Sequence, residues 1–151
     1  MRVIQILPNL GAGGAEVLVT NLGIHLAKNG HKIIITALFD PLGSDKESAL
    51  TQKRCLIDAG VEVIFLNKHL GFDLKMFQKV LNLFRNFHPD VVHTHRYVLR
   101  YTLLPMLLCR IPVRVHTVHN VAQKEVDWVG KLVHWIAFRL GKVVPVSISQ
   151  E

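Results

Sequence analysis

Three short segments of the sequence together supply glycine, histidine, arginine and asparagine, which are residues suited to binding hydroxyls and phosphates. They are residues 11–16 (G-A-G-G-A-E), 93–96 (H-T-H-R) and 116–120 (H-T-V-H-N). Glycine lets the backbone approach a ligand closely, and the unpaired N–H groups of a helix N-terminus attract an anion. Each segment lies at the end of a run rich in β-branched residues. These segments are therefore candidates for chemistry, provided that the fold brings them together.

The remainder of the chain alternates short β-branched runs with longer stretches of helical periodicity, which predicts alternating strands and helices. Gly30 and Gly60 stand where the first two helices are expected to end, and Asp73 is expected to cap the third. Pro105 is expected to kink or shorten the fourth helix. The predicted strands are residues 2–7, 32–38, 61–66, 91–95, 113–118 and 143–147, and the predicted helices are residues 14–29, 47–59, 73–87, 97–110 and 125–140.

This order of elements predicts an α/β fold in which residues 1–151 form a single Rossmann-like domain around a doubly wound parallel sheet. The second strand is continuously apolar at Ile33, Ile34 and Ile35, as expected of a strand that helices cover on both faces. The usual strand order of such a sheet, 3-2-1-4-5-6, places strands one and four side by side, and ligands bind beyond the carboxyl ends of the strands. The three candidate segments follow strands one, four and five, so this fold predicts that they line one crevice.

The composition restricts the classes of partner. The net charge of +7 and the pI of about 9.7 favour nucleic acid, an anionic membrane or a phosphate-bearing substrate. The sequence has no zinc spacing, basic recognition helix or aromatic-interleaved basic strand, so we expect no nucleic-acid partner. No apolar stretch is long enough to span a membrane. Cys55 and Cys109 fit no metal or redox spacing and are interpreted as reduced, buried thiols of a cytosolic protein.

Four histidines near the predicted crevice suggest a metal site, namely His93, His95, His116 and His119. No carboxylate or cysteine completes a recognisable ligand spacing around them. His93 is expected to be a strand residue that packs under the site. We therefore expect no bound metal, and we expect no other cofactor.

The glycine segment also fits an NAD-dependent dehydrogenase, because residues 11–16 begin like G-x-G-x-x-G and Asp40 is placed like a ribose-binding acid. Glu16, however, stands where the third glycine is required. Purely structural interpretations stay open as well. The glycines can simply shape a tight turn, Glu16 can stabilise the positive end of the first helix, and Arg96 can be a solvated residue at a helix start.

Four short motifs follow one another along the chain: residues 13–16 (G-G-A-E), 89–95 (P-D-V-V-H-T-H), 118–120 (V-H-N) and 146–147 (V-S). In order and spacing they resemble the G-G-x-E, P-D-[VI]-[VI]-H-x-H, T-x-H-[DN] and V-S segments of retaining, GT4-type glycosyltransferases with the GT-B fold. The match extends over the whole chain, and its specificity comes from the four motifs together.

The resemblance implies a two-domain enzyme of which this chain is the N-terminal, acceptor-side half. Gly13 and Gly14 would lie against the phosphates of a nucleotide-sugar donor, and His119 would be the catalytic residue that reaches the donor sugar. The residues expected to bind the acceptor or to line the cleft are Glu16, His95, Arg96 and Asn120.

The resemblance also implies transfer with retention of the anomeric configuration, without a metal, to a sugar or lipid-linked acceptor in cell-envelope or polysaccharide biosynthesis. The donor-binding second domain is absent from residues 1–151, which end in S-Q-E like the first turn of a helix. We therefore expect this chain alone to be inactive. A non-catalytic sugar- or nucleotide-binding module is the alternative from another class, and such a module would be complete at this length.

We also expect the protein to be cytoplasmic and to lie on the inner face of the cell membrane. Basic residues on or near the third and fourth predicted helices would rest on the anionic surface. The alternative is a solvated basic face, with Leu74, Phe77, Leu81 and Phe84 buried against the sheet. The basic residues concerned are Lys68, Lys75, Lys79, Arg85, Arg100 and Arg110.

Overall fold

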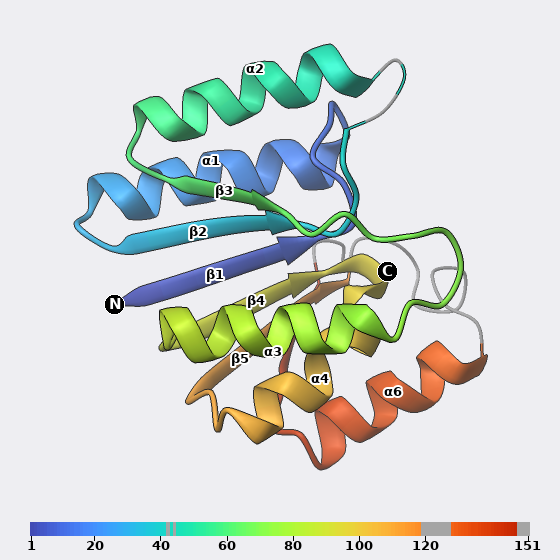
Figure 1. The fold of residues 1–151 in the computed structure, drawn as a ribbon. Coiled ribbons are helices and arrows are strands. Elements are labelled where there is room, and N and C mark those ends of the chain that lie inside the picture. Colours follow the sequence, from blue (N-terminus) through green and yellow to red (C-terminus); the bar gives the residue numbers. More distant parts are fainter. Residues whose placement is uncertain (42, 44, 119–127, 148–151) are drawn as a thin grey trace.

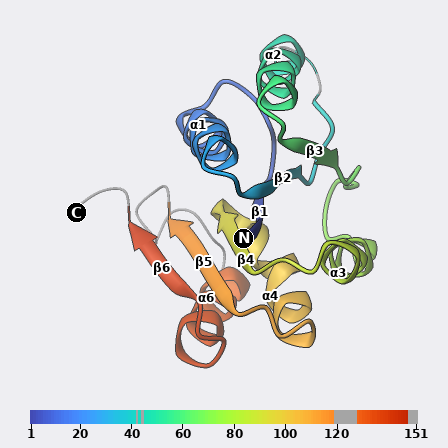
Figure 2. The same ribbon diagram turned by 90° about the vertical axis from the view of Figure 1, so that its left-hand side faces the viewer.

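In the computed structural model, which describes residues 1–41, 43, 45–118 and 128–147, a six-stranded sheet lies between two groups of helices (Figures 1 and 2). Each predicted strand and helix is present, with ends that differ by a few residues. The strands are β1 (Arg2–Leu7), β2 (Lys32–Ala37), β3 (Glu62–Phe65), β4 (Val91–His95), β5 (Val113–Val118) and β6 (Val144–Ser147). The helices are α1 (Gly14–Lys28), α2 (Asp45–Asp58), α3 (Lys75–Phe87), the 3-10 helix η1 (Arg96–Val98), α4 (Leu99–Leu108) and α6 (Trp128–Arg139).

The sheet has the strand order β3-β2-β1-β4-β5-β6, and every neighbouring pair is parallel. β1 pairs with β2 on one side, where Ile4 lies opposite Ile34, and with β4 on the other, where Ile4 lies opposite Val92. The direction of winding reverses between β1 and β4, so their carboxyl ends meet at the switch point of the sheet. The predicted doubly wound parallel order is confirmed.

The core has two parts, one on each face of the sheet. α3, α4 and α6 cover one face of the sheet, and α1 and α2 cover the other (Figure 2). Ile4 and Ile6 belong to the core on the first face, and Val3 and Leu7 belong to the core on the second. All four of these side chains are at most 4% exposed. Because successive residues of a strand alternate between faces, a strand covered on both sides is mostly apolar. The polar exception in β1 is Gln5, which is fully buried and donates to the carbonyl oxygen of Val19 at 3.4 Å.

The two cysteines are free, and the prediction that both are buried is wrong. Cys55 is exposed and Cys109 is partly buried. α2 packs on the sheet through Ala49 and Leu56, which are both fully buried. Cys55 precedes Leu56 by one residue and is therefore rotated by about 100° around the helix axis, toward solvent.

α3 packs through a stripe that matches the predicted one only in part, at Phe77 and Phe84. Met76, Val80 and Phe84 are buried, each one helical turn from the next, whereas Leu74 is 72% exposed and Leu81 is only partly buried. The difference arises at the start of the helix, because α3 begins at Lys75 and Leu74 belongs to the preceding loop. The i, i+4 spacing from Met76 then sets which side of the helix faces the sheet.

The start of α3 is fixed by Asp73, as predicted. Its carboxylate accepts the backbone N–H of Lys75 at 3.0 Å and that of His69 at 3.2 Å. These hydrogen bonds lower the pKa of Asp73, with the bond from His69 as the largest cause.

The helix expected from residue 97 begins as η1 and continues as α4, which contains Pro105 and ends at Leu108. α6 begins at Trp128 in the structure, and its expected start at residue 125 lies outside the described residues. No helix in the described ranges combines the length and the apolar character required to cross a membrane.

The corrected packing of α3 gives a paired prediction. Met76→Ala removes a fully buried side chain and is expected to lower the free energy of unfolding by about 2–5 kcal/mol. Leu74→Ala removes an exposed one and is expected to change it by less than about 0.5 kcal/mol. Urea denaturation of both variants measures the difference. Equal losses, or the larger loss at Leu74, would contradict this packing.

Candidate functional site

The position predicted for the crevice is where β1 and β4 end side by side. Gly13 is the residue before α1, His95 is the last residue of β4, and Arg96 begins η1. β5 pairs with β4 along the same edge, so its end borders the crevice as well. His119 and Asn120, which are expected to contact donor and acceptor there, lie outside the described residues.

A neighbouring side chain, and not the backbone conformation, is the reason that position 13 requires glycine. Its φ of −70° and ψ of 161° are an extended conformation that any residue adopts. A Cβ atom added at Gly13, however, would lie 2.3 Å from Oε2 of Glu16, whereas one added at Gly14 would meet no atom within 4 Å. The carboxylate of Glu16 therefore folds back over Gly13 at the N-terminus of α1. Gly14 leaves open space above the first turn of the helix.

Glu16 and Arg96 form an ion pair that joins α1 to the end of β4. Nη1 of Arg96 lies 3.6 Å from Oε1 of Glu16, and the side chain of Glu16 is only 8% exposed. Arg96 adopts a left-handed φ of 57°, a conformation that is uncommon for a residue with a side chain. Both residues were open to a purely structural interpretation, and the structure brings them together beside Gly13. A negative group and a positive group thus face each other at the mouth of the crevice.

Gln52 of α2 holds the glycine segment in place, and the sequence reasoning missed it. Its Nε2 donates to the carbonyl oxygen of Gly11, and its Oε1 accepts the hydroxyl proton of Thr20 at 2.8 Å. The loop is therefore tied to both α1 and α2. A glutamine on an otherwise amphipathic helix gives no signal in the sequence, because its partner is 41 residues away.

The histidines of β4 lie on one face of the sheet. The ring centroids of His93 and His95 are 4.1 Å apart, and Nε2 of His93 lies 2.7 Å from Oγ1 of Thr117. His95 is fully buried, and His93 is partly buried beneath it, in agreement with the expected place of His93 under the site. The two rings therefore lie against each other at the end of β4, directly before Arg96 in the chain.

His116 lies on the opposite face. It is fully buried, its Nδ1 lies 2.9 Å from Oγ1 of Thr94, and its ring centroid is 4.9 Å from that of His134 on α6. Burial, and secondarily the positive charge of Arg100, lowers the pKa of His134. Because the sheet separates His116 from His93, these histidines cannot converge on one ion. Within the described residues there is no group of three or more His, Cys, Asp or Glu arranged to hold a metal.

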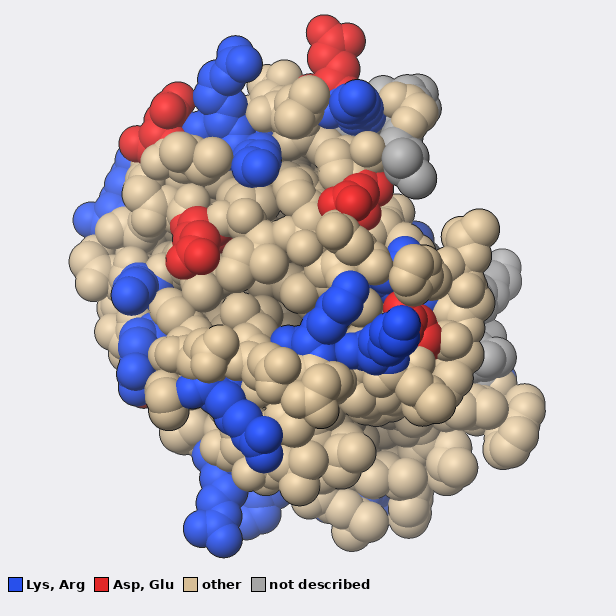
Figure 3. Space-filling model, in the orientation of Figure 1, with Lys and Arg blue, Asp and Glu red and all other residues tan. Residues whose placement is uncertain are grey.

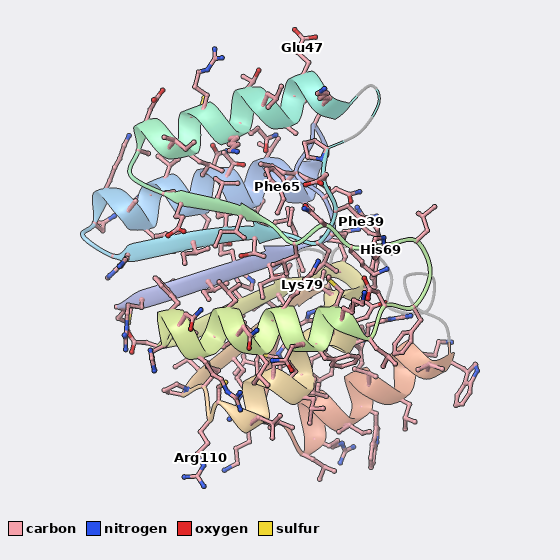
Figure 4. The ribbon with its side chains drawn as sticks, in the orientation of Figure 1. Phe39, Glu47, Phe65, His69, Lys79 and Arg110 are labelled. Carbon is pink, nitrogen blue, oxygen red and sulfur yellow. The ribbon has the colours of Figure 1, made fainter. Side chains whose placement is uncertain are left out.

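A second group of side chains lies at the carboxyl ends of β2 and β3, where Figure 4 shows Phe39, His69 and Lys79 close together. The ammonium of Lys68 lies 4.9 Å from the ring centroid of Phe39 and 5.3 Å from that of Tyr101, and it donates to the carbonyl of His69 at 2.8 Å. Lys79 donates to backbone carbonyls just after β3. Both lysines thus hold the loop before α3, in addition to carrying charge. In the sequence, only the position of these lysines after the third predicted strand could have indicated this role.

Comparisons with known proteins agree with this architecture. The sequence model of the family described as Glycosyltransferase Family 4 matches residues 12–149. The crystal structure of a glycosyltransferase from Rickettsia africae ESF-5 is similar with a TM-score of 0.61 at 17% sequence identity. That match covers 98% of this chain and 42% of the Rickettsia chain, so this chain spans less than half the length of that protein. A search of curated proteins finds no relative of significant similarity.

Two other solved structures are similar at a lower level. One is the hydratase GalB from Pseudomonas putida KT2440, with a TM-score of 0.44 and 11% identity over 63% of this chain and 47% of that one. The other is a short-chain dehydrogenase/reductase from Sinorhizobium meliloti 1021, with a TM-score of 0.43 and 14% identity over 98% of this chain and 96% of that one. Scores this low carry no argument about function.

The two glycines before and in the first turn of α1 give opposite predictions for stability. Gly13→Ala forces the Glu16 carboxylate away from the helix N-terminus, and we expect it to lower the free energy of unfolding by about 1 kcal/mol. Gly14→Ala adds a better helix former where space is open, and we expect it to be neutral or to stabilise by up to about 1 kcal/mol. Thermal unfolding monitored by circular dichroism compares the two. The same loss at both positions would contradict the placement of Glu16 over Gly13.

Proposed function

The chain belongs to glycosyltransferase family 4, and from that premise we propose that it is the acceptor-side half of a two-domain, GT-B enzyme. This enzyme transfers a sugar from a nucleotide sugar to a sugar or lipid-linked acceptor of a cell envelope or polysaccharide, with retention of configuration. A second domain binds most of the donor. The greater length of the similar Rickettsia glycosyltransferase supports the existence of a second domain.

The observation that carries this proposal is the glycine segment at the N-terminus of α1, which faces Arg96 across the junction of β1 and β4. The N–H groups of a helix N-terminus and a guanidinium are both suitable donors to phosphate oxygens. The open space above Gly14 lets a diphosphate approach the helix, and the Arg96 side chain is 39% exposed although it pairs with Glu16. Donor phosphates placed here would have the sugar above the ends of β4 and β5.

The chemistry follows from that placement. The acceptor hydroxyl oxygen attacks the anomeric carbon from the side of the departing diphosphate, the bond to the phosphate oxygen breaks, and the hydroxyl proton passes to the departing phosphate. Gly13 and Gly14 then favour the charge that develops on the leaving group, as electrostatic stabilisation requires. His119 reaches the donor sugar. Glu16, His95, Arg96 and Asn120 line the acceptor side of the cleft, and their individual roles are part of the proposal.

A non-catalytic module that binds a sugar or a nucleotide in the same crevice is the second candidate, because the crevice alone supplies donors for hydroxyls and phosphates. It differs from the enzyme in needing no second domain. The dehydrogenase alternative is set aside because the matching family is a glycosyltransferase family. The proposal places the enzyme in the cytoplasm, on the inner face of the cell membrane, without a metal or a nucleic-acid partner.

We expect residues 1–151 alone to transfer no sugar, because the groups that neutralise the departing nucleoside diphosphate belong to the second domain. The measurement is release of nucleoside diphosphate from a panel of nucleotide sugars, with and without candidate acceptors. Turnover by these residues alone would contradict the two-domain proposal. If both residues 1–151 and the full-length protein bind a nucleotide sugar tightly without turnover, the non-catalytic module would be favoured.

In the full-length protein, His119→Ala is expected to lower kcat by about 100-fold with little change in thermal stability, because the side chain acts on the donor sugar in the transition state. His25→Ala, at an exposed position on α1, is the matched control and should leave kcat unchanged. Steady-state kinetics and a melting curve test both. An unchanged kcat in the His119 variant would assign His119 a structural role.

A further inference from the structure

The positive charge of the protein is concentrated in one part of the chain. Residues 91–147 contain eight Lys and Arg residues and two acidic residues, whereas the remaining segments contain ten basic and nine acidic residues. This segment, which includes β4, η1, α4, β5, α6 and β6, therefore carries +6 of the net charge of +7. The basic residues in its described part are Arg96, Arg100, Arg110, Arg114, Lys131, Arg139 and Lys142.

The outer side of α6 adds apolar surface to this charge. Trp128 is 76% exposed, Leu132 is 48% exposed and Trp135 is 56% exposed. At about 100° per residue these three side chains and Arg139 fall within about 60° of arc, so they form one stripe along the helix. Lys131 and Arg139 are exposed beside the apolar residues. A helix that presents tryptophan and leucine together with lysine and arginine is typical of helices that lie in a membrane interface.

α4 continues this surface. It packs against α6, and its side chains Leu104 and Leu108 are 52% and 60% exposed. Arg110 follows α4, and Figure 4 shows its side chain extending away from the body of the protein. In Figure 3 no acidic side chain appears on the surface over α6. We call this surface, made of Leu104, Leu108, Trp128, Leu132, Trp135 and Arg139, the α4–α6 face.

Other exposed apolar positions lack the same charge environment. α2 exposes Leu50 and Ile57 to a similar extent, 48% and 54%, but this helix also carries Asp45, Glu47 and Asp58. The loop before α3 exposes Leu70, Phe72 and Leu74, but it also contains Asp73, and Lys68 and Lys79 beside it donate to backbone carbonyls. Within the described residues, α4 and α6 combine exposed tryptophan and leucine with basic residues and carry no acidic residue.

We propose that the α4–α6 face is a docking surface for an anionic membrane. The indole rings and leucines enter the interface between headgroups and acyl chains, while the guanidinium and ammonium groups stay at the level of the lipid phosphates. This inference rests on the membrane partner of the proposed function and names the surface of the protein that contacts it. α6 begins at the edge of the molecule where the strands have their carboxyl ends (Figure 1), so docking brings the crevice close to lipid-linked acceptors.

Both tryptophans of the chain, Trp128 and Trp135, lie on the α4–α6 face, so the intrinsic fluorescence of the unmodified protein reports on it directly. We expect vesicles of phosphatidylcholine with phosphatidylglycerol to shift the emission to shorter wavelength, and brominated lipids to quench it. Vesicles of phosphatidylcholine alone should do so weakly, and high salt should reduce the effect of the anionic vesicles. An emission spectrum unchanged by anionic vesicles at low salt would overturn the proposal.

The variant Leu132→Gln with Trp135→Gln tests whether this face does the binding, and Leu50→Gln with Ile57→Gln on α2 is its control with matched exposure. In co-sedimentation with anionic vesicles, we expect the α6 variant to bind about tenfold more weakly and the α2 variant to bind like the unmodified protein. Circular dichroism checks that both variants are folded. Equal binding by the α6 and α2 variants would refute the assignment of the docking surface to α6, but it would still support a membrane partner.

If the unmodified protein does not sediment with anionic vesicles at all, the membrane partner itself fails. Neither assay contains a nucleotide sugar, so sugar transfer is tested separately. Vesicle binding by a full-length protein that transfers no sugar would contradict the proposed reaction and not the docking surface.

Discussion

The pairing of β1 with β4 is the constraint on which the rest of the structure depends. β1 is the strand at which the winding of the sheet reverses, and it is buried on both faces, with Ile4 and Ile6 against one helical layer and Val3 and Leu7 against the other. Its register with β4 places the glycine segment that follows β1 beside His95 and Arg96. The crevice is thus a consequence of strand order, and its rigidity comes from the packing beneath it.

The electrostatics of the crevice depend on an internal balance between Glu16 and Arg96. A helix N-terminus attracts anions, but here a buried carboxylate of the same helix already lies there. Arg96 pairs with that carboxylate and offsets its charge. Gln52 adds a neutral constraint by binding the carbonyl of Gly11. A loop held by an ion pair on one side and an amide on the other is suited to keeping its glycines fixed while a ligand approaches.

The helical layers on the two sides of the sheet differ in chemistry. α1 and α2 carry both signs of charge and border the glycine segment, whereas α4 and α6 carry only positive charge and expose tryptophan and leucine. Exposure of such apolar surface to water is unfavourable, and so is the mutual repulsion of the basic groups. One asymmetric molecule therefore combines a polar crevice at the carboxyl edge of the sheet with an apolar, basic side.

The sequence by itself determined the strands, their parallel order and the two segments, after β1 and β4, that meet at the switch point, because runs of β-branched residues and glycine-terminated helices are local signals. The tertiary structure alone decided which side of α3 is buried, since Met76, Val80 and Phe84 are selected by where Asp73 starts the helix and by the shape of the sheet below. It also decided that Glu16 pairs with Arg96, 80 residues away in the chain, and that His116 faces away from His93. These contacts join residues far apart in sequence, and no local pattern records a partner that only folding brings within reach.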